Sequence, residues 1–206
     1  MTQDAKSKSR AAFDRQAPVY DSTRFGQHAR WLAPDVLTEL EGLRPESLLD
    51  VGCGTGALLE AVAAALPGGR LYGVDLSVQM VAIAQRRLGE TAVITVADAD
   101  AETLPLPDGA VDDVTCVDSF HHYPHPDAAL LEIRRVIRPG GSLILAEWCM
   151  PAPTRRLMNS FIHRLPDGDV RVYSQSELCR LAAAAGFSEL RWRKAGRRGQ
   201  LLVGRR

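Results

Sequence analysis

Several features are scarce in this sequence of 206 residues, and each absence excludes a class of protein. It contains no run of eighteen apolar residues, so we expect no transmembrane helix and no membrane partner. Its 25 basic and 25 acidic side chains cancel, whereas a dedicated nucleic-acid-binding domain is usually strongly basic. Its four cysteines lie far apart, which provides neither a zinc-ligand pair nor a redox pair. We therefore expect no nucleic-acid partner and no metal site.

The composition that remains is typical of one cytoplasmic globular domain. The first ten residues carry charges but lead into no apolar segment, so no secretory signal is expected and the cysteines should be reduced. Hydrophobic residues make up 46% of the chain, enough for an extensive core. Residues 151–206 hold 12 basic and 4 acidic side chains, a pattern compatible with an anionic partner or with a solvated arginine-rich surface.

Short apolar runs alternate with helical patterns along most of the chain. The runs predict strands at 47–51, 70–75, 92–97, 111–117 and 142–148, and the patterns between them predict helices at 57–66, 78–88 and 127–137. Strands separated by helices pair in parallel, because each crossover helix returns the chain to the same end of the sheet. The sequence therefore predicts a doubly wound α/β fold with helices on both faces of a mostly parallel sheet.

The two ends of the chain differ from this pattern. Residues 188–194 and 200–206 are apolar runs joined by a turn too short for a helix, which predicts an antiparallel hairpin at one end of the sheet. We expect residues 1–41 to form a helical lid and residues 42–206 to form the main domain. Residues 149–173 show no clear periodicity and are predicted to be an insertion that caps the substrate side.

The strongest chemical signal is the stretch LLDVGCGTG at residues 48–56, between the first predicted strand and its helix. Gly52 and Gly54 allow the backbone to approach a ligand closely, and the following helix points free N–H groups toward it. Asp75, at the end of the second predicted strand, can accept hydrogen bonds from two ribose hydroxyls. Since Gly52, Gly54 and Ala57 also fit the dinucleotide pattern G-x-G-x-x-A, the spacing alone leaves the nucleotide undecided.

The same stretch resembles the first motif of the class I S-adenosylmethionine-dependent methyltransferases, in particular the small-molecule branch that includes the ubiquinone/menaquinone C-methyltransferases. Further segments resemble later motifs in the family's order: FDRQAPVYD (13–21), VDLS (74–77), DAETLPLPDGAVD (100–112), the histidine pair and Pro-Gly-Gly turn within 120–148, and YSQSELCRLAAAAGF (173–187). The resemblance covers residues 13–206. It implies a seven-stranded sheet with one reversed strand, S-adenosylmethionine as cofactor, and methyl transfer to a small organic molecule.

The resemblance also implies which residues hold the cofactor: Tyr20, Asp50, Gly52, Cys53, Gly54, Asp75, Leu76, Asp100, Ala101, Val117 and Asp118. Asp50 would orient the methionine ammonium group, Asp75 would bind the ribose, and Leu76 would pack on the adenine. Asp98 competes with Asp100 as the acid that reads the adenine edge, and Asp100 has the family spacing to the following Leu-Pro pair.

The candidate catalytic residues are His121 and His122, which follow the fourth predicted strand. This places them at the carboxyl edge of the sheet, near the expected position of the transferred methyl group. A histidine of ordinary pKa suits proton removal near neutral pH, and the alternative is that both residues only shape the pocket or cap the next helix. Neighbouring residues in an extended loop point to opposite sides, so we expect at most one of the two to face the site.

Three other functions fit part of the sequence. A nicotinamide-dependent oxidoreductase shares the glycine loop and Asp75, but should continue with parallel strands instead of a hairpin. A regulatory protein could bind the cofactor without turnover, and a nucleic-acid methyltransferase could use the basic residues after 150. The sequence does not determine the acceptor atom, the substrate or the oligomeric state.

Overall fold

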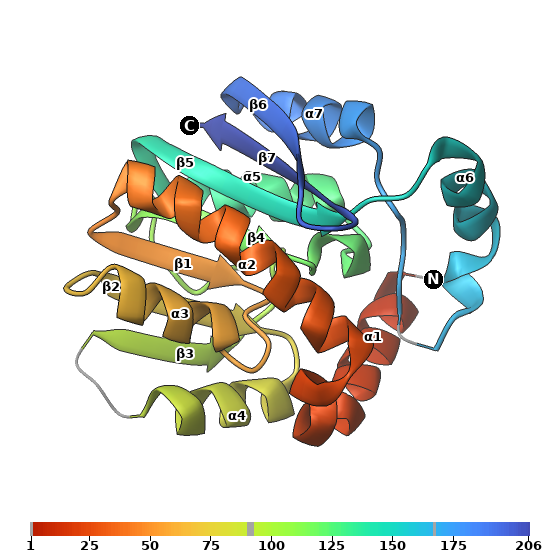
Figure 1. The fold of residues 1–206 in the computed structure, drawn as a ribbon, viewed down its shortest axis with the longest axis horizontal. Coiled ribbons are helices and arrows are strands. Elements are labelled where there is room, and N and C mark those ends of the chain that lie inside the picture. Colours follow the sequence, from red (N-terminus) through yellow and green to blue (C-terminus); the bar gives the residue numbers. More distant parts are fainter. Residues whose placement is uncertain (1, 90–92, 167) are drawn as a thin grey trace.

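The computed structural model describes residues 2–89, 93–166 and 168–206 and is built around a seven-stranded sheet (Figure 1). The strands are β1 (Ser47–Val51), β2 (Arg70–Asp75), β3 (Ile94–Asp98), β4 (Val111–Val117), β5 (Ile137–Trp148), β6 (Ser188–Ala195) and β7 (Gly199–Arg205). Their spatial order is β3-β2-β1-β4-β5-β7-β6, and β7 is antiparallel to both of its neighbours. The predicted parallel sheet with a C-terminal antiparallel hairpin is thereby confirmed.

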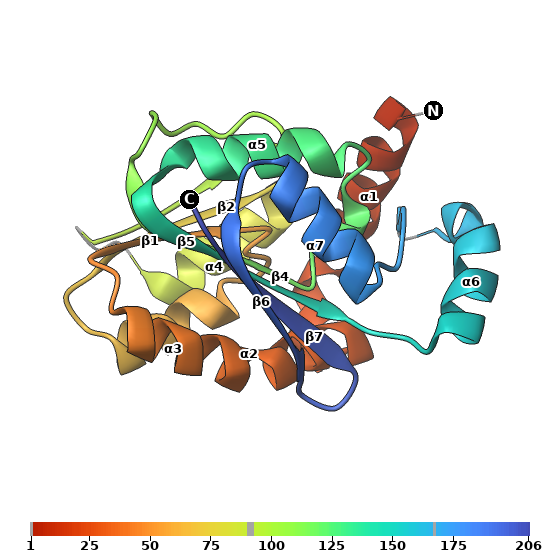
Figure 2. The same ribbon diagram turned by 90° about the horizontal axis from the view of Figure 1, so that it is seen from above.

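Helices cover both faces of the sheet (Figure 2). They are α1 (Thr2–Gln16), α2 (Arg24–Leu43), α3 (Ala57–Ala65), α4 (Val78–Leu88), α5 (Pro126–Val136), α6 (Ala152–Phe161) and α7 (Gln175–Ala184), with short 3-10 helices η1 (Ala17–Ser22), η2 (Phe120–His122) and η3 (Ile162–Arg164). Helices α2, α3 and α4 pack on one face, and α5 and α7 pack on the other. Within the described residues, no helix is both long and apolar enough to span a membrane.

The alternation of side chains along β1 divides the interior into two cores. Leu48 packs with the α2 and α3 side and its neighbour Leu49 packs with the α5 side, and both are completely buried. Successive residues of a strand face opposite sides of the sheet, so a continuous apolar run is what a strand covered on both faces requires. This burial fixes the position of β1, and therefore of the glycine loop that follows it.

Local sequence signals determine where helix α4 begins and ends. The Ser77 side chain accepts a hydrogen bond from the Met80 amide at 3.2 Å, which caps the start of α4. Met80 and Ala84 lie on the buried face of α4, and Gly89 follows its end with a positive φ of 69°. The N-terminus of α4 consequently lies beside the carboxyl end of β2, next to Asp75.

The structure differs from the sequence prediction in two places. Strand β5 begins at Ile137 and not at residue 142, with a register shift between Val111 and Asp113 of β4 where the Pro-Gly-Gly segment bulges out. The insertion at 149–173 contains helix α6, which buries none of its residues and projects away from the sheet (Figure 2). The first predicted residue of the third strand, at position 92, lies outside the described residues.

Candidate functional site

The glycine loop after β1 is held in a shape that only glycine adopts easily. Gly52 and Gly54 have φ values of 77° and 54°. A Cβ atom at Gly52 would lie 1.9 Å from the Ser119 hydroxyl oxygen, so the loop after β4 can pack this closely only against glycine. A Cβ at Gly54 would meet no atom within 4 Å among the described residues, so the space above Gly54 is open for a ligand.

A cavity of about 350 Å³ lies at the carboxyl ends of β1, β2 and β4. All eleven residues implied by the resemblance to hold the cofactor line it: Tyr20, Asp50, Gly52, Cys53, Gly54, Asp75, Leu76, Asp100, Ala101, Val117 and Asp118. His122 lines the same cavity. Asp98 pairs with Asp75 in the sheet register but is exposed and does not line the cavity, so the geometry favours Asp100 as the acid at this position.

Asp75 connects the end of β2 to the glycine loop. One carboxylate oxygen accepts a hydrogen bond from the Gly54 amide at 2.8 Å, and the other accepts one from the Ser77 amide at 2.9 Å. Burial raises the pKa of Asp75 above its ordinary value, although both backbone hydrogen bonds favour the charged form. A carboxylate has about four acceptor positions, so two remain for the hydroxyls of a ribose.

Asp50, the last polar residue of β1, is almost completely buried at 2% exposure. Burial raises its pKa to about 7, although the Thr115 hydroxyl donates a hydrogen bond to it at 2.8 Å and favours the charged form. The nearby Asp75 carboxylate raises the pKa further. A cation bound in the cavity would shift Asp50 toward its ionised form.

Side chains of α1 and η1 fasten the N-terminal segment over this cavity. The Lys6 ammonium group lies 2.6 Å from an Asp100 carboxylate oxygen and 2.7 Å from one of Glu102. The Ser77 hydroxyl donates to Asp14 at 2.6 Å. Asp21 accepts a hydrogen bond from the Thr55 hydroxyl at 2.8 Å and pairs with Arg87 of α4. These contacts link the segment to the glycine loop, to α4 and its N-cap, and to the loop after β3.

A second cavity of about 80 Å³ adjoins the first. Its aromatic walls are Phe13, Tyr20, Phe25 and Trp148, and its polar residues are Gln16, His28, Asp118, His121, His122 and Asp169. Phe13, Tyr20, Asp118 and His122 line both cavities and so stand between them. Aromatic walls with a few convergent polar groups are the kind of lining found in sites for small organic ligands, although a cavity of about 80 Å³ is smaller than a whole ligand site.

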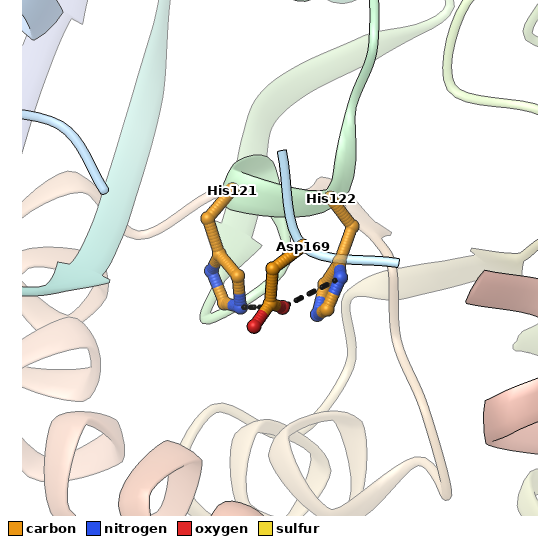
Figure 3. A group of neighbouring side chains, drawn as sticks. All are labelled: His121, His122 and Asp169. Atoms are coloured by element: carbon orange, nitrogen blue, oxygen red, sulfur yellow. Dashed lines mark ion pairs between the residues drawn. The ribbon is translucent and has the colours of Figure 1, made fainter. Parts of the chain in front are cut away.

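The polar end of the second cavity is a group of neighbouring histidines and acids (Figure 3). His121 Nδ1 lies 2.7 Å from one carboxylate oxygen of Glu147, whose other oxygen accepts the amides of Ser119 at 3.0 Å and Phe120 at 2.7 Å. Asp169 Oδ1 lies 3.7 Å from His121 Nε2 and 3.2 Å from His122 Nδ1. Asp169 thus contacts both histidines.

The two histidines have opposite pKa shifts. Burial alone would lower the pKa of His121, but the Glu147 carboxylate outweighs it and raises the pKa to about 9. Burial and the positive charge of His121 lower the pKa of His122 well below its ordinary value. In the metal-free protein the Glu147 carboxylate thus favours the charged form of His121, and burial favours the neutral form of His122.

Of the two histidines only His122 lines the first cavity, but the reasoning behind the expectation that at most one faces the site does not hold. It assumed an extended loop, whereas residues 120–122 form the 3-10 helix η2. The two rings lie on one side with centroids 4.1 Å apart, and both line the second cavity, although only His122 also lines the first. Their catalytic role stays a prediction.

Three residues of this cluster were missed by the sequence reasoning. Glu147 is a carboxylate inside an apolar strand, and a buried charge in such a run is a signal that could have identified it. His28 of α2 lies with Nδ1 2.9 Å from Asp118 Oδ2, and Asp169 follows η3 in an irregular segment. Neither belongs to a local pattern that marks it.

Comparisons with known proteins agree with this site. Residues 49–145 match the family described as methyltransferase domain. A malonyl-[acyl-carrier protein] O-methyltransferase of Geobacter sulfurreducens is 34% identical over 190 residues, which are 88% of this chain and 70% of that protein. A ubiquinone/menaquinone biosynthesis C-methyltransferase of Cupriavidus metallidurans is 39% identical over 127 residues, 60% of this chain and 51% of that protein. The chain thus spans about half the length of the second relative.

Comparison with solved structures also finds similarity to a methyltransferase. A SAM-dependent methyltransferase from Aquifex aeolicus superposes with a TM-score of 0.66 at 26% identity, covering 84% of this chain and 88% of that one. The sheet order with one reversed strand, the glycine loop and Asp75 define a Rossmann-like nucleotide-binding protein of the class I methyltransferase type. Together with the sequence relatives, they show that the chain belongs to the S-adenosylmethionine-dependent methyltransferases.

The residues present fit S-adenosylmethionine, the cofactor of this family. The open space above Gly54 is a cradle that a side chain would fill. The two remaining acceptor positions of Asp75 match a vicinal diol, and the buried Asp50 matches a cationic ammonium group. Asp100 and Leu76 line the same cavity at the positions that the resemblance assigns to the adenine.

Proposed function

We propose that this protein transfers a methyl group from S-adenosylmethionine to a small organic molecule by in-line displacement. The observation that carries the proposal is the pair of adjoining cavities, one lined by the family's cofactor residues and the other apolar with a polar end. The cofactor, when bound, supplies a methyl group already activated by a positively charged sulfur. What remains for the protein is to align the acceptor and to exclude water.

The cofactor would extend across the first cavity from Asp50 to Asp100. In this arrangement Asp50 holds the ammonium group, Asp75 holds the ribose, and Asp100 with Ala101 reads the adenine edge. The presence of all these side chains in the lining of one cavity supports this assignment. Asp50 is the member best suited to a cation, because ionising it without one is disfavoured by burial.

The acceptor would occupy the second cavity, against the aromatic walls. We assign His121 and His122 to its polar end, where they would orient the acceptor atom toward the first cavity. His122 borders both cavities, which supports a position close to the transferred methyl group. Residues 1–41 would act as a lid through Lys6, and residues 149–173 as a cap that supplies Asp169. A cytoplasmic location remains a prediction from the sequence.

Calorimetry with S-adenosylhomocysteine tests the cofactor site. We expect micromolar binding to the wild type and loss of binding in Asp75→Ala. Asp98→Ala is the matched control, because Asp98 ends the neighbouring strand in register with Asp75 but does not line the cavity. An unliganded wild type, or equal binding by wild type and Asp75→Ala, contradicts the proposal. Quenching or enhancement of NADH fluorescence would favour the oxidoreductase alternative instead.

Formation of S-adenosylhomocysteine from S-adenosylmethionine tests turnover. The named relatives act on a quinone precursor and on a malonyl thioester, so a demethylated quinone and a malonyl thioester are the first acceptors to try, followed by pooled small hydroxy, amino and thiol compounds. We expect product with at least one acceptor. Cofactor binding without any turnover across the pool would indicate a regulatory protein.

A further inference from the structure

Three side chains of residue types that can bind metal ions lie together at the polar end of the second cavity (Figure 3). His121 and His122 come from η2, and Asp169 comes from the irregular segment after η3. One ligand atom from each of these residues lies within 4.8 Å of the other two. Two histidines and one carboxylate are a frequent ligand set for divalent transition metals, in both zinc and non-haem iron sites.

The distances match the spacing of ligands around one ion. Two ligand atoms about 2.0–2.2 Å from a zinc ion at the tetrahedral angle are about 3.3–3.5 Å apart. Asp169 Oδ1 lies 3.2 Å from His122 Nδ1 and 3.7 Å from His121 Nε2, values on either side of that spacing.

The surrounding contacts hold the first histidine in the orientation that a metal ligand needs. Glu147 binds His121 at Nδ1, so Nε2 is the atom left to face Asp169. A carboxylate on the far nitrogen of a ligating histidine is the usual outer partner in metal sites. The backbone carbonyl of His121 also accepts the amides of Val170 at 2.8 Å and Arg171 at 3.2 Å. These bonds fasten the segment that carries Asp169 to η2.

His122 supplies an independent indication. Its side chain is only 10% exposed, and among the described residues its Nδ1 atom has no hydrogen-bond partner of acceptable geometry. Asp169 lies near this nitrogen, but not in line for a hydrogen bond. Buried polar atoms are rarely left in this state. A metal ion bound at this nitrogen would give it a partner.

We propose that His121, His122 and Asp169 bind a divalent transition-metal ion such as Zn²⁺, with its remaining coordination position open to the second cavity. Three protein ligands and one open position are the arrangement of catalytic zinc sites, in contrast to the closed arrangement of structural ones. The open position would take water or an oxygen or thiol group of an acceptor. That last role rests on the proposed function, whereas metal binding itself does not.

A second group, Asp118, His121 and Glu147, also has its ligand atoms within 4.8 Å of one another. Its carboxylates are already engaged: Asp118 by His28 at 2.9 Å, and Glu147 by His121 and two backbone amides. A metal ion there would have to displace these bonds and would leave His122 Nδ1 without a partner, so the ion is expected in the group that contains His122.

Calorimetric titration of the metal-free full chain with Zn²⁺ at neutral to slightly alkaline pH tests the site. We expect one equivalent to bind to the wild type, and at least tenfold weaker binding in Asp169→Asn and in His122→Ala. His163→Ala is the matched control, because His163 lies on the neighbouring η3, is exposed and is not part of the cluster. Co²⁺ should give visible absorption bands of a four-coordinate nitrogen- and oxygen-ligated ion in the wild type.

Asp169 does not line the first cavity, so binding of S-adenosylhomocysteine by Asp169→Asn shows that the fold persists and separates this proposal from the function. Loss of zinc binding with unchanged nucleoside binding in Asp169→Asn supports a metal site made by these residues, and thermal unfolding shows whether His122→Ala remains folded. A wild type that takes up no Zn²⁺ and gives no Co²⁺ bands overturns the proposal, whatever its methyl transfer activity. Equal zinc binding by the wild type and by both cluster variants also overturns it, because the ion would then bind elsewhere.

Discussion

The Asp75 carboxylate accepts a hydrogen bond from the Gly54 amide at 2.8 Å, and this one contact joins the end of the second strand to the glycine loop. The same carboxylate accepts the Ser77 amide at the start of α4. Because Asp75 also lines the larger cavity, one side chain both shapes the loop and faces the ligand. Gly52 packs against Ser119, whereas Gly54 borders open space. We therefore expect substitutions at these two glycines to affect the stability of the fold and the binding of the ligand separately.

Alanine at Gly52 or at Gly54 should make this separation visible. In Gly52→Ala the new Cβ atom would lie 1.9 Å from the Ser119 hydroxyl, so we expect a loss of about 2–5 kcal/mol in the free energy of unfolding. Gly54→Ala adds only backbone strain of about 1–2 kcal/mol, but its Cβ enters the cavity and should abolish nucleoside binding. Urea unfolding and calorimetry give the two quantities. Equal destabilisation by both substitutions would contradict this account of the loop.

The buried Asp50 predicts how stability depends on pH in the ligand-free protein. Its pKa of about 7 exceeds its ordinary value of 3.8, so the folded protein keeps a proton that the unfolded chain has already lost. The free energy of unfolding therefore falls as pH rises between these two values, and the loss is complete above the folded pKa.

Asp50→Asn removes this titration. We expect the variant to gain stability relative to the wild type between about pH 5 and about pH 8, as measured by urea unfolding at several pH values. Asp98→Asn serves as the control, because Asp98 is exposed and should leave the pH dependence unchanged. A stability difference between Asp50→Asn and wild type that does not vary with pH would show that Asp50 is ionised throughout.

The contacts of Arg87 hold the N-terminal segment over the larger cavity and lead to a prediction about ligand release. Its guanidinium group donates to the Thr55 carbonyl at 3.0 Å and to the Thr55 hydroxyl at 2.9 Å, and it pairs with Asp21 of η1. Arg87→Ala should speed dissociation of S-adenosylhomocysteine roughly five- to tenfold, which corresponds to about 1 kcal/mol for a partly exposed ion pair.

Stopped-flow measurement of nucleoside release checks this expectation. Arg86→Ala is the matched control, because Arg86 precedes it on the same helix but is exposed. Release that is equally fast in the wild type and in Arg87→Ala would mean that the Asp21 contact does not retain the ligand.

The sequence predicted those parts of the molecule that depend on contiguous residues. Leu48 and Leu49 belong to a run of apolar residues, and such a run is required for a strand buried on both faces. The shape of the glycine loop depends on positive φ angles at Gly52 and Gly54, which few residues other than glycine adopt. The glycines in the sequence therefore marked the loop. For the same reason the eleven cofactor residues, which follow strand ends or lie in short motifs, all line one cavity in the structure.

The parts that were not predicted depend on contacts between distant segments. Asp169 contacts His121 and His122 from almost fifty residues away, and nothing in the irregular sequence around it marks a functional position. His28 lies on a helix whose pattern reports only its packed face. The orientation of the two histidines depended on the short helix η2, for which no local signal was recognised.

The strand order has a consequence for how the protein is made. Strand β7 lies between β5 and β6, although it is the last of the three to be synthesised. While the ribosome is still translating the preceding residues, β5 has an unpaired edge and β6 has no partner in the sheet. This half of the sheet contains Glu147, which contacts His121. It can form completely only after translation has passed residue 205.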